Sequence, residues 1–318
     1  MNEGRAFHYR AYGLVFSSEL ELPQFLPVAA AAGLDARIRF GPVPETLGPG
    51  RREGYKFEVR GAQTLIKTPR YAFLLISGGS EIRIRPNPEA TAAELRMLVL
   101  GVGVGALLHQ RGILPLHAGV IARHGGAVAF CAASGTGKST LTAALVQQGF
   151  RIMDDNLAAL ELAGEVPLVH PGCPEIKLFD DVLARCPPAW REGAPSGPCG
   201  PKTGLILRPQ FEPEARALRG IFILAATPSP MRRPRRLHGP EAVQAIHDHI
   251  FCARFMDHGL RSGAAFTGVL ALAGKVPVYA LDLGIPKLTP ERTLAGIQSL
   301  LNGMLPASIQ EQESGELR

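Results

Sequence analysis

Residues 132–140 read Ala132-Ala133-Ser134-Gly135-Thr136-Gly137-Lys138-Ser139-Thr140. The stretch matches the phosphate-binding pattern G-x-x-x-x-G-K-[ST] at every position except the first, where Ala132 replaces glycine. Gly135 and Gly137 allow the backbone to bend so that successive N–H groups point at phosphate oxygens. The pattern therefore predicts a nucleotide-binding loop between a strand and a helix. The alternative is a glycine-rich turn that happens to precede Lys-Ser.

Each residue type in this loop predicts a role. Lys138 is expected to reach the β- and γ-phosphates and the Ser139 hydroxyl to ligate Mg²⁺, while the following helix N-terminus adds positive partial charge. The predicted cofactors are ATP and Mg²⁺; no Asn-Lys-x-Asp motif for reading guanine occurs. The predicted cofactor-binding residues are Ser134, Gly135, Thr136, Gly137, Lys138, Ser139 and Thr140.

The neighbouring sequence supplies the context that such a loop needs. Two strands are expected at 115–122 and 127–131, joined by the turn signal His124-Gly125-Gly126. Helical composition follows at 138–148, and a further strand is expected at 150–153. The order strand, loop, helix, strand is the arrangement of a phosphate-binding loop.

Two carboxylates and one histidine complete the candidate site. Asp154-Asp155 follows the apolar run 151–153, where an acidic Mg²⁺ partner is expected. Adjacent strand residues point opposite ways, so one aspartate could hold Mg²⁺ and the other accept a proton; the alternative is that both simply open a turn. His117, in Leu116-His117-Ala118, is either a catalytic group or a core histidine.

Composition limits the class of protein. The chain has 318 residues, a formal net charge of +6 and five cysteines. The charge is scattered, so a nucleic-acid partner is not expected, and an odd number of cysteines without a CxxC pair fits free thiols in a reducing compartment. The first ten residues carry no secretory signal, and the apolar stretch 97–108 is too short to span a bilayer. A cytoplasmic protein with no membrane partner is expected.

The remaining chain predicts a mixed architecture. Residues 8–85 read as short strands, with 9–17 as one of them, and a helical pattern then runs from 87 to about 110. Residues 184–204 read as a long loop. Later helices are expected at 240–257, 262–271 and 290–302, with strands at 220–225 and 276–283. The predicted division is an N-terminal β-rich domain at 1–88, a domain with the phosphate-binding loop at 89–307 and a flexible tail at 308–318.

Taken together, these motifs resemble the kinase domain of HPr kinase/phosphorylase. The residues that carry the resemblance are His117-Ala118-Gly119-Val120, the loop 133–139 and Asp154-Asp155-Asn156. The opening 9–23 is similar to that of shorter HPr-kinase-like serine kinases found beside ribosomal-peptide clusters, including those acting on lasso-peptide precursors. The resemblance implies an α/β (α+β) fold with a P-loop core of the HPr kinase and phosphoenolpyruvate-carboxykinase type, joined to an N-terminal β-rich part.

The resemblance also implies roles and partners. Asp154 would be the general base toward a serine hydroxyl, Asp155 would support Mg²⁺ with Ser139, and His117 would orient the base. The implied partner is a peptide or small protein, and the related kinases suggest a homo-oligomer. The family signature Glu-Ile-Arg-Gly has only a faint counterpart in 175–178, which contains Lys177. Lys177, or Lys202 in the long loop, is a candidate for a substrate or phosphate contact; the alternative is that both are ordinary surface lysines.

Three functions remain open on this sequence. The first is an ATP-dependent kinase that acts on serine in a peptide or small protein. The second is a kinase for a small metabolite on the same fold. The third is a nucleotide-gated binding protein in a peptide-modification pathway, which would need one metal carboxylate and no base.

Overall fold

The computed structural model describes residues 6–30, 33–48, 51–53, 56–191, 195–199, 201–227, 233–253, 264–284 and 290–306. These residues form a mixed α/β structure with several sheets, which agrees with the expected fold class. The predicted tail at 308–318 lies outside the described residues.

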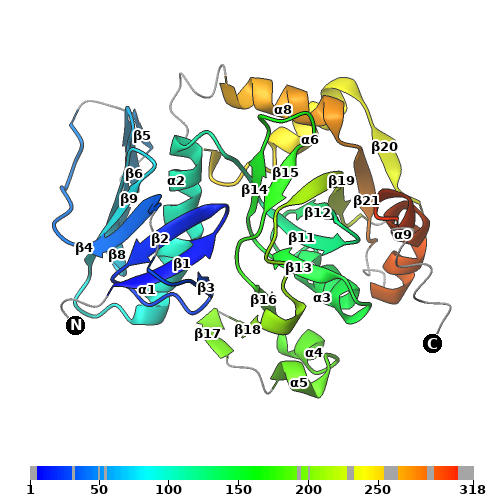
Figure 1. Ribbon diagram of the computed structural model, residues 1–318, viewed down its shortest axis with the longest axis horizontal. Coiled ribbons are helices and arrows are strands. Elements are labelled where there is room, and N and C mark those ends of the chain that lie inside the picture. Colours follow the sequence, from blue (N-terminus) through cyan, green and yellow to red (C-terminus); the bar gives the residue numbers. More distant parts are fainter. Residues whose placement is uncertain are drawn as a thin grey trace.

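The N-terminal residues form one nine-stranded sheet, drawn in blue and cyan in Figure 1. Alternating buried positions, such as Leu14, Phe16 and Ser18 in β2, give it one face for the core. Its strand order is β3-β1-β2-β4-β9-β8-β7-β6-β5. The strands are β1 (Phe7–Ala11), β2 (Leu14–Ser18), β3 (Leu26–Pro27), β4 (Ala36–Phe40), β5 (Arg51–Glu53), β6 (Phe57–Arg60), β7 (Gln63–Thr68), β8 (Ala72–Ser77) and β9 (Glu81–Pro86).

The prediction of one strand over 9–17 is wrong, because a tight turn at Tyr12-Gly13 divides it into β1 and β2. Both turn residues have positive φ, 56° for Tyr12 and 76° for Gly13. Such a turn suits the right-handed twist of a hairpin. Tyrosine is a strand former that rarely adopts this conformation, so the sequence pattern concealed the turn.

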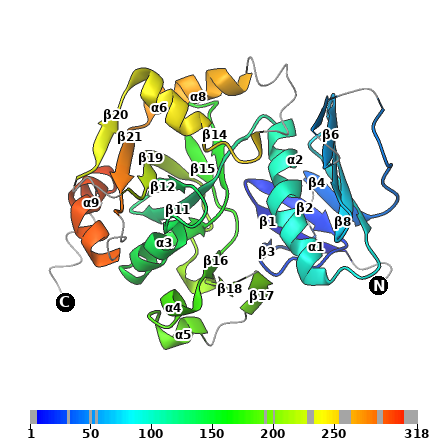
Figure 2. The same cartoon turned by 180° about the vertical axis from the view of Figure 1, so that it is seen from behind.

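A helical segment packs beside this sheet, near β1, β2 and β8 (Figures 1 and 2). It comprises α1 (Ala92–Leu98), a π-helical turn (Val99–Gly103) and α2 (Val104–Gln110). It begins at Thr91, whose side chain forms a capping box with Glu94. The segment 92–110 is long and apolar enough to cross a membrane by length and composition, unlike the shorter stretch considered from sequence. Here 56% of its apolar window is buried, and α2 contacts β8, β9 and β10.

The second nine-stranded sheet carries the candidate site. Its order is β10-β14-β15-β19-β12-β11-β13, with β21 beside β19 and β20 beside β21. Only His117 separates β10 from β11 in the chain, although they lie far apart in this order, so the sheet must curl round on itself. The strands are β10 (Leu114–Leu116), β11 (Ala118–Arg123), β12 (Gly126–Ala132), β13 (Arg151–Asp154), β14 (Ala158–Glu161), β15 (Leu168–His170), β19 (Arg216–Ala225), β20 (Arg235–Leu237) and β21 (Val278–Asp282).

Strand β12 is fully buried and lies between β11 and β19. It is parallel to β19, whereas β11 is antiparallel to both β12 and β13. Strands β12 and β13 therefore run in the same direction with β11 between them, and their carboxyl ends lie at one edge of the sheet. The predicted hairpin at 124–126 is confirmed: His124 and Gly125 have φ of 49° and 76° and join β11 to β12.

Residues 184–204 are not the long loop expected from their proline and glycine content. They include α5 (Pro188–Arg191), β17 (Pro195–Cys199) and the start of β18 (Lys202–Ile206), while α4 (Asp180–Leu183) precedes them. Strand β18 pairs with β17 and with β16 (Glu175–Leu178) in a three-stranded sheet. Pairing with β16 is a tertiary interaction, so local composition did not reveal it.

Helices cover the second sheet on its outer sides (Figure 1). Within the expected helix at 240–257, α6 ends at His247, because the next residues pair with another element: His249 O accepts a hydrogen bond from His117 N at 2.7 Å, and Ile250 forms a β-bridge with Leu116. Residues 254–257 of that prediction lie outside the described residues. The helices are α3 (Lys138–Gln147), the 3₁₀ turn (Arg208–Gln210), α6 (Gly239–His247), α8 (Ala264–Lys275) and α9 (Pro290–Met304).

Candidate phosphate-binding site

The glycine-rich loop connects the carboxyl end of β12 to the N-terminus of α3. Gly135 and Gly137 have φ of 81° and 118°, values that favour glycine, and Gly137 is the residue at which α3 begins. Ala132, which replaces the first glycine of the pattern, is the last residue of β12, and its φ is not positive. Alanine fits that strand conformation without strain, so this departure does not disturb the loop.

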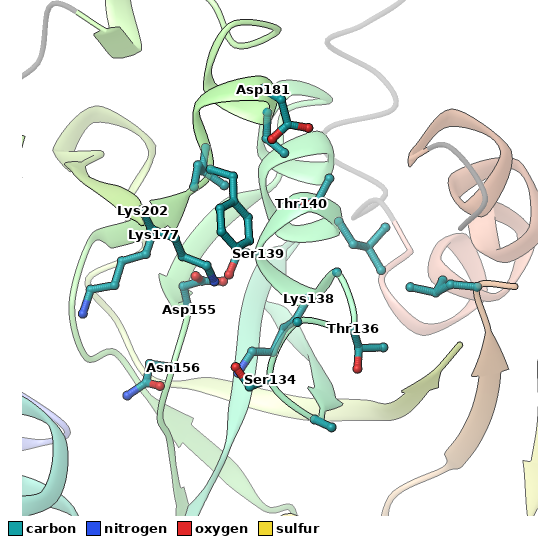
Figure 3. Close-up of a pocket in the computed structure, with 18 of the residues that line it drawn as sticks. Ser134, Thr136, Lys138, Ser139, Thr140, Asp155, Asn156, Lys177, Asp181 and Lys202 are labelled. Carbon is teal, nitrogen blue, oxygen red and sulfur yellow. The ribbon is translucent and has the colours of Figure 1, made fainter. Parts of the chain in front are cut away.

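The loop forms one wall of a cavity of about 480 Å³. A second wall comes from 177–185 and Lys202, and a third from Leu283 and Thr293. Figure 3 shows these side chains around the N-terminus of α3. The predicted residues that line the cavity are Ser134, Gly135, Thr136, Gly137, Lys138, Ser139, Thr140, His117, Asp155, Lys177 and Lys202.

Lys138 lies at the bottom of this cavity and is 8% exposed. Its Nζ is 3.0 Å from His117 Nε2, and His117 Nδ1 is 3.2 Å from the carbonyl oxygen of Asn156. Since the ammonium can only donate, Nε2 accepts and Nδ1 carries the proton. Burial and the neighbouring Lys138 lower the pKa of His117 to about 4, and burial lowers the pKa of Lys138. His117 therefore contacts the lysine and not, as expected, an aspartate acting as a base.

Asp155 points into the cavity from the end of β13, and Figure 3 shows it beside Ser139. The Ser139 hydroxyl and the Lys177 backbone N–H both favour the charged form of its carboxylate and oppose a rise in its pKa. Its Oδ1 is buried and has no hydrogen-bond partner among the described residues. Burial raises the pKa of Asp155 to about 6, against the opposing effect of Lys138. A buried carboxylate oxygen without a partner, beside a hydroxyl, is a donor set that a hard cation accepts.

Asp154 has the opposite surroundings and does not line the cavity. Its Oδ1 accepts hydrogen bonds from the backbone of Asn156 and Leu157, at 2.7 and 2.9 Å. Its Oδ2 accepts from the Tyr12 hydroxyl at 3.0 Å and from Cys173 N at 2.9 Å. Burial raises the pKa of Asp154, although these bonds oppose the increase. The residue expected to act as a base is thus bound within the protein, because the turn after β13 directs it away from the cavity.

The two candidate lysines lie on the second wall. Lys177 Nζ is 3.2 Å from Glu175 Oε2, and Lys202 Nζ lies 4.9 Å from the centre of the Phe179 ring. Both lie on the small sheet, in β16 and β18. This places two cations beside the loop, and Arg185 adds a third at the same wall, paired with Asp181 at 3.3 Å.

Several cavity residues were not predicted. Asn156, Phe179, Asp181 and Arg185 line the cavity. Asn156 lies within the quoted motif 154–156, whereas the other three belong to no sequence pattern with a chemical meaning of its own. Gly119 of β11, within the quoted motif His117-Ala118-Gly119-Val120, does not line the cavity but lies next to residues that do. A Cβ at Gly119 would lie 2.7 Å from Thr142 Oγ1 and 3.4 Å from both Lys138 Cγ and Asp155 Oδ1.

Comparisons with known proteins do not show a family for this chain. No family model matches this chain, and no curated protein matches it. Among solved structures, it is similar to the HPr(Ser) kinase/phosphatase from Coxiella burnetii, with 13% identity and a TM-score of 0.31, over 59% of this chain and 99% of that chain. A likeness at this level carries no argument about function.

Proposed function

We propose that this chain is an ATP-dependent kinase that transfers the γ-phosphoryl group to a serine hydroxyl of a peptide or small protein. One observation carries the proposal: the loop 132–140 brings Lys138, Ser139 and the buried Asp155 together in one cavity at the N-terminus of α3. Backbone N–H groups and a lysine suit phosphates, and phosphoryl transfer depends mainly on positioning and charge.

The donor set of the cavity fits Mg²⁺. Ser139 and Asp155 would hold the ion, which would neutralise charge on the phosphates. The unpartnered Oδ1 of Asp155 supports this fit, since buried polar atoms normally have partners. Lys138 would leave His117 Nε2 for the phosphates, and His117, neutral at pH 7 with its pKa near 4, would add no competing charge.

The residue predicted to act as a general base toward the acceptor hydroxyl, Asp154, does not line the cavity. The acceptor oxygen attacks the γ-phosphorus, the bond to the bridging oxygen breaks and ADP leaves, while the hydroxyl proton passes to the transferred phosphoryl group and from there to solvent. Asp154 can accept the acceptor proton only if one of its oxygens gives up its two hydrogen bonds and turns toward the cavity. In a loose transition state little base strength is needed, so we propose that Asp155, Lys138 and the loop are sufficient for transfer.

The same observation gives support to a second function. If Asp154 stays bound, the cavity contains one carboxylate of the pair, which is what a nucleotide-gated binding protein requires. A small-metabolite kinase would use the same groups with a different acceptor. The choice therefore depends on whether a phosphoryl group leaves ATP and on what receives it.

The deciding experiment is mass spectrometry of serine-containing peptides after incubation with ATP, Mg²⁺ and the protein. The panel should include ribosomal precursor peptides as well as unrelated sequences. We expect a gain of one phosphate on serine with the wild type and none with Lys138→Ala, whose folding should be retained because the change removes a charge that acts on phosphate. Equal transfer by both proteins would contradict the assigned site. Nucleotide binding without transfer to any peptide would favour the alternatives.

A further inference from the structure

Tyr12 occupies a backbone conformation that bulky residues seldom adopt. It has a φ of 56° at the tip of the hairpin between β1 and β2. Glycine or asparagine would be the usual residue at such a turn. Strain of this kind persists where surrounding contacts compensate for it, and it often marks a site that matters for function.

The compensating contacts join the N-terminal sheet to the candidate site. Tyr12 is 2% exposed. Its hydroxyl donates to Asp154 Oδ2 at 3.0 Å, and its backbone N–H donates to the carbonyl of Pro171 at 2.6 Å. One residue of the hairpin tip therefore binds both the end of β13 and the segment that follows β15.

Two glycines permit this close approach. A Cβ at Gly172 would lie 2.1 Å from Asp154 Oδ2 and 2.3 Å from Tyr12 Cε1. A Cβ at Gly13 would lie 2.7 Å from His170 Nδ1. A side chain at Gly172 would therefore prevent the Tyr12 ring from reaching Asp154, and a side chain at Gly13 would collide with His170 beside this contact.

We propose that Tyr12 is a positioning residue for the candidate phosphate site. It holds Asp154, whose Oδ1 in turn binds the backbone N–H groups of Asn156 and Leu157 and so fixes the turn that presents Asp155 and Asn156 to the cavity. The Asn156 carbonyl also receives His117 Nδ1–H, so the position of His117 beside Lys138 depends on the same turn. The catalytic part of this inference rests on the proposed function.

The test compares Tyr12→Phe with Tyr9→Phe as a matched control. Tyr9 is also buried in β1, at 5% exposed, but its hydroxyl accepts from Leu22 N within the N-terminal part. Three quantities are measured: hydrogen exchange of peptides covering 154–157, affinity for a non-hydrolysable ATP analogue with Mg²⁺, and kcat for ADP formation from MgATP. The exchange measurement needs no acceptor.

For Tyr12→Phe we expect faster exchange at 154–157, a kcat lower by about 10–100-fold, and an affinity within about twofold of wild type, because small misplacements of reacting groups reduce rate more than binding. Tyr9→Phe should change none of these. Unchanged exchange in Tyr12→Phe, or the same change in both variants, would overturn the positioning role, and faster exchange with unchanged kcat would overturn its catalytic importance. Faster exchange in Tyr12→Phe, with no ADP formed by the wild type even in the presence of the serine-containing peptides, would support the coupling and overturn the proposed transfer.

Discussion

At the scale of single residues, the neighbouring aspartates differ in how their oxygens are satisfied. Asp154 accepts four hydrogen bonds, whereas Oδ1 of Asp155 is buried with no partner in the described part of the chain. A buried carboxylate without full hydrogen bonding destabilises the folded state, while a fully bonded one stabilises it. The two residues should therefore respond to the same substitution in opposite ways.

Asp154→Asn should lower the free energy of unfolding by about 1–3 kcal/mol, because an amide cannot accept all four bonds. Asp155→Asn should leave stability at pH 7 unchanged or raise it, yet lose Mg²⁺-dependent nucleotide binding. Thermal unfolding, and nucleotide affinity with and without Mg²⁺, measure both effects. If Asp154→Asn keeps its stability and nucleotide binding but loses transfer, Asp154 acts as the base and the roles inferred from the geometry are incorrect.

At the scale of elements, β11 and α3 pack closely because Gly119 has no side chain. We expect Gly119→Ala to destabilise the protein by about 1–3 kcal/mol through overpacking and to weaken nucleotide binding, since its Cβ would meet groups of the cavity. Gly101→Ala, in the π-helical turn where a Cβ has no atom within 4 Å, is the matched control and should be neutral or slightly stabilising. Equal effects of both changes on nucleotide affinity would contradict the packing argument.

The buried carboxylate of Glu58 in the N-terminal sheet should make the stability of the protein depend on pH. Glu58 in β6 is 3% exposed and binds Lys67 Nζ at 2.7 Å, the Leu47 N–H at 2.7 Å and the Thr46 hydroxyl at 2.8 Å. Burial alone would raise its pKa, but these bonds outweigh burial and lower the pKa from 4.5 to about 2. A depressed folded-state pKa means that Glu58 stabilises the fold above pH 4.5 and that this contribution is lost as the pH falls toward 2.

Glu58→Gln should therefore reduce the free energy of unfolding at pH 7 by about 1–3 kcal/mol, with a smaller difference from wild type at pH 3. Urea unfolding at the two pH values measures this, with Glu89→Gln, on an exposed residue, as the control. A difference from wild type that stays constant between pH 7 and pH 3 would show that the charge of Glu58 does not contribute.

At the scale of the whole molecule, the predicted boundary at residue 88 crosses a continuous hydrophobic core. One cluster contains Phe16 and Ile84 from the first sheet, Leu107 from α2, and Leu157 and Cys173 from the other part of the chain. The division into 1–88 and 89–307 remains a prediction, as does the homo-oligomer. For the two parts to fold separately, each would have to bury its own apolar residues of this core without the other part.

We accordingly expect the fragment 89–307 to aggregate or to lack cooperative unfolding, because removal of the first sheet would expose the α1–α2 face and leave Asp154 without Tyr12. Size-exclusion chromatography and circular dichroism of the fragment, beside the full chain, measure this. A monodisperse fragment that unfolds cooperatively would establish residue 88 as a domain boundary.

The sequence by itself determined the local features of this protein. Glycines at 135 and 137, the lysine after them and the apolar strand before them specify a loop by short-range backbone rules, and the hairpin at 124–126 follows from the same rules. Such features depend on neighbouring residues alone, so a pattern was sufficient to locate them.

Only the tertiary structure decided which groups meet. The direction of Asp154 depends on Tyr12 and Cys173, 142 and 19 residues away along the chain. The contact of His117 with Lys138 depends on the curling of the second sheet, and strand β18 forms through its pairing with β16 and β17. Long-range pairing is set by burial and hydrogen bonding between distant segments, which no local pattern encodes.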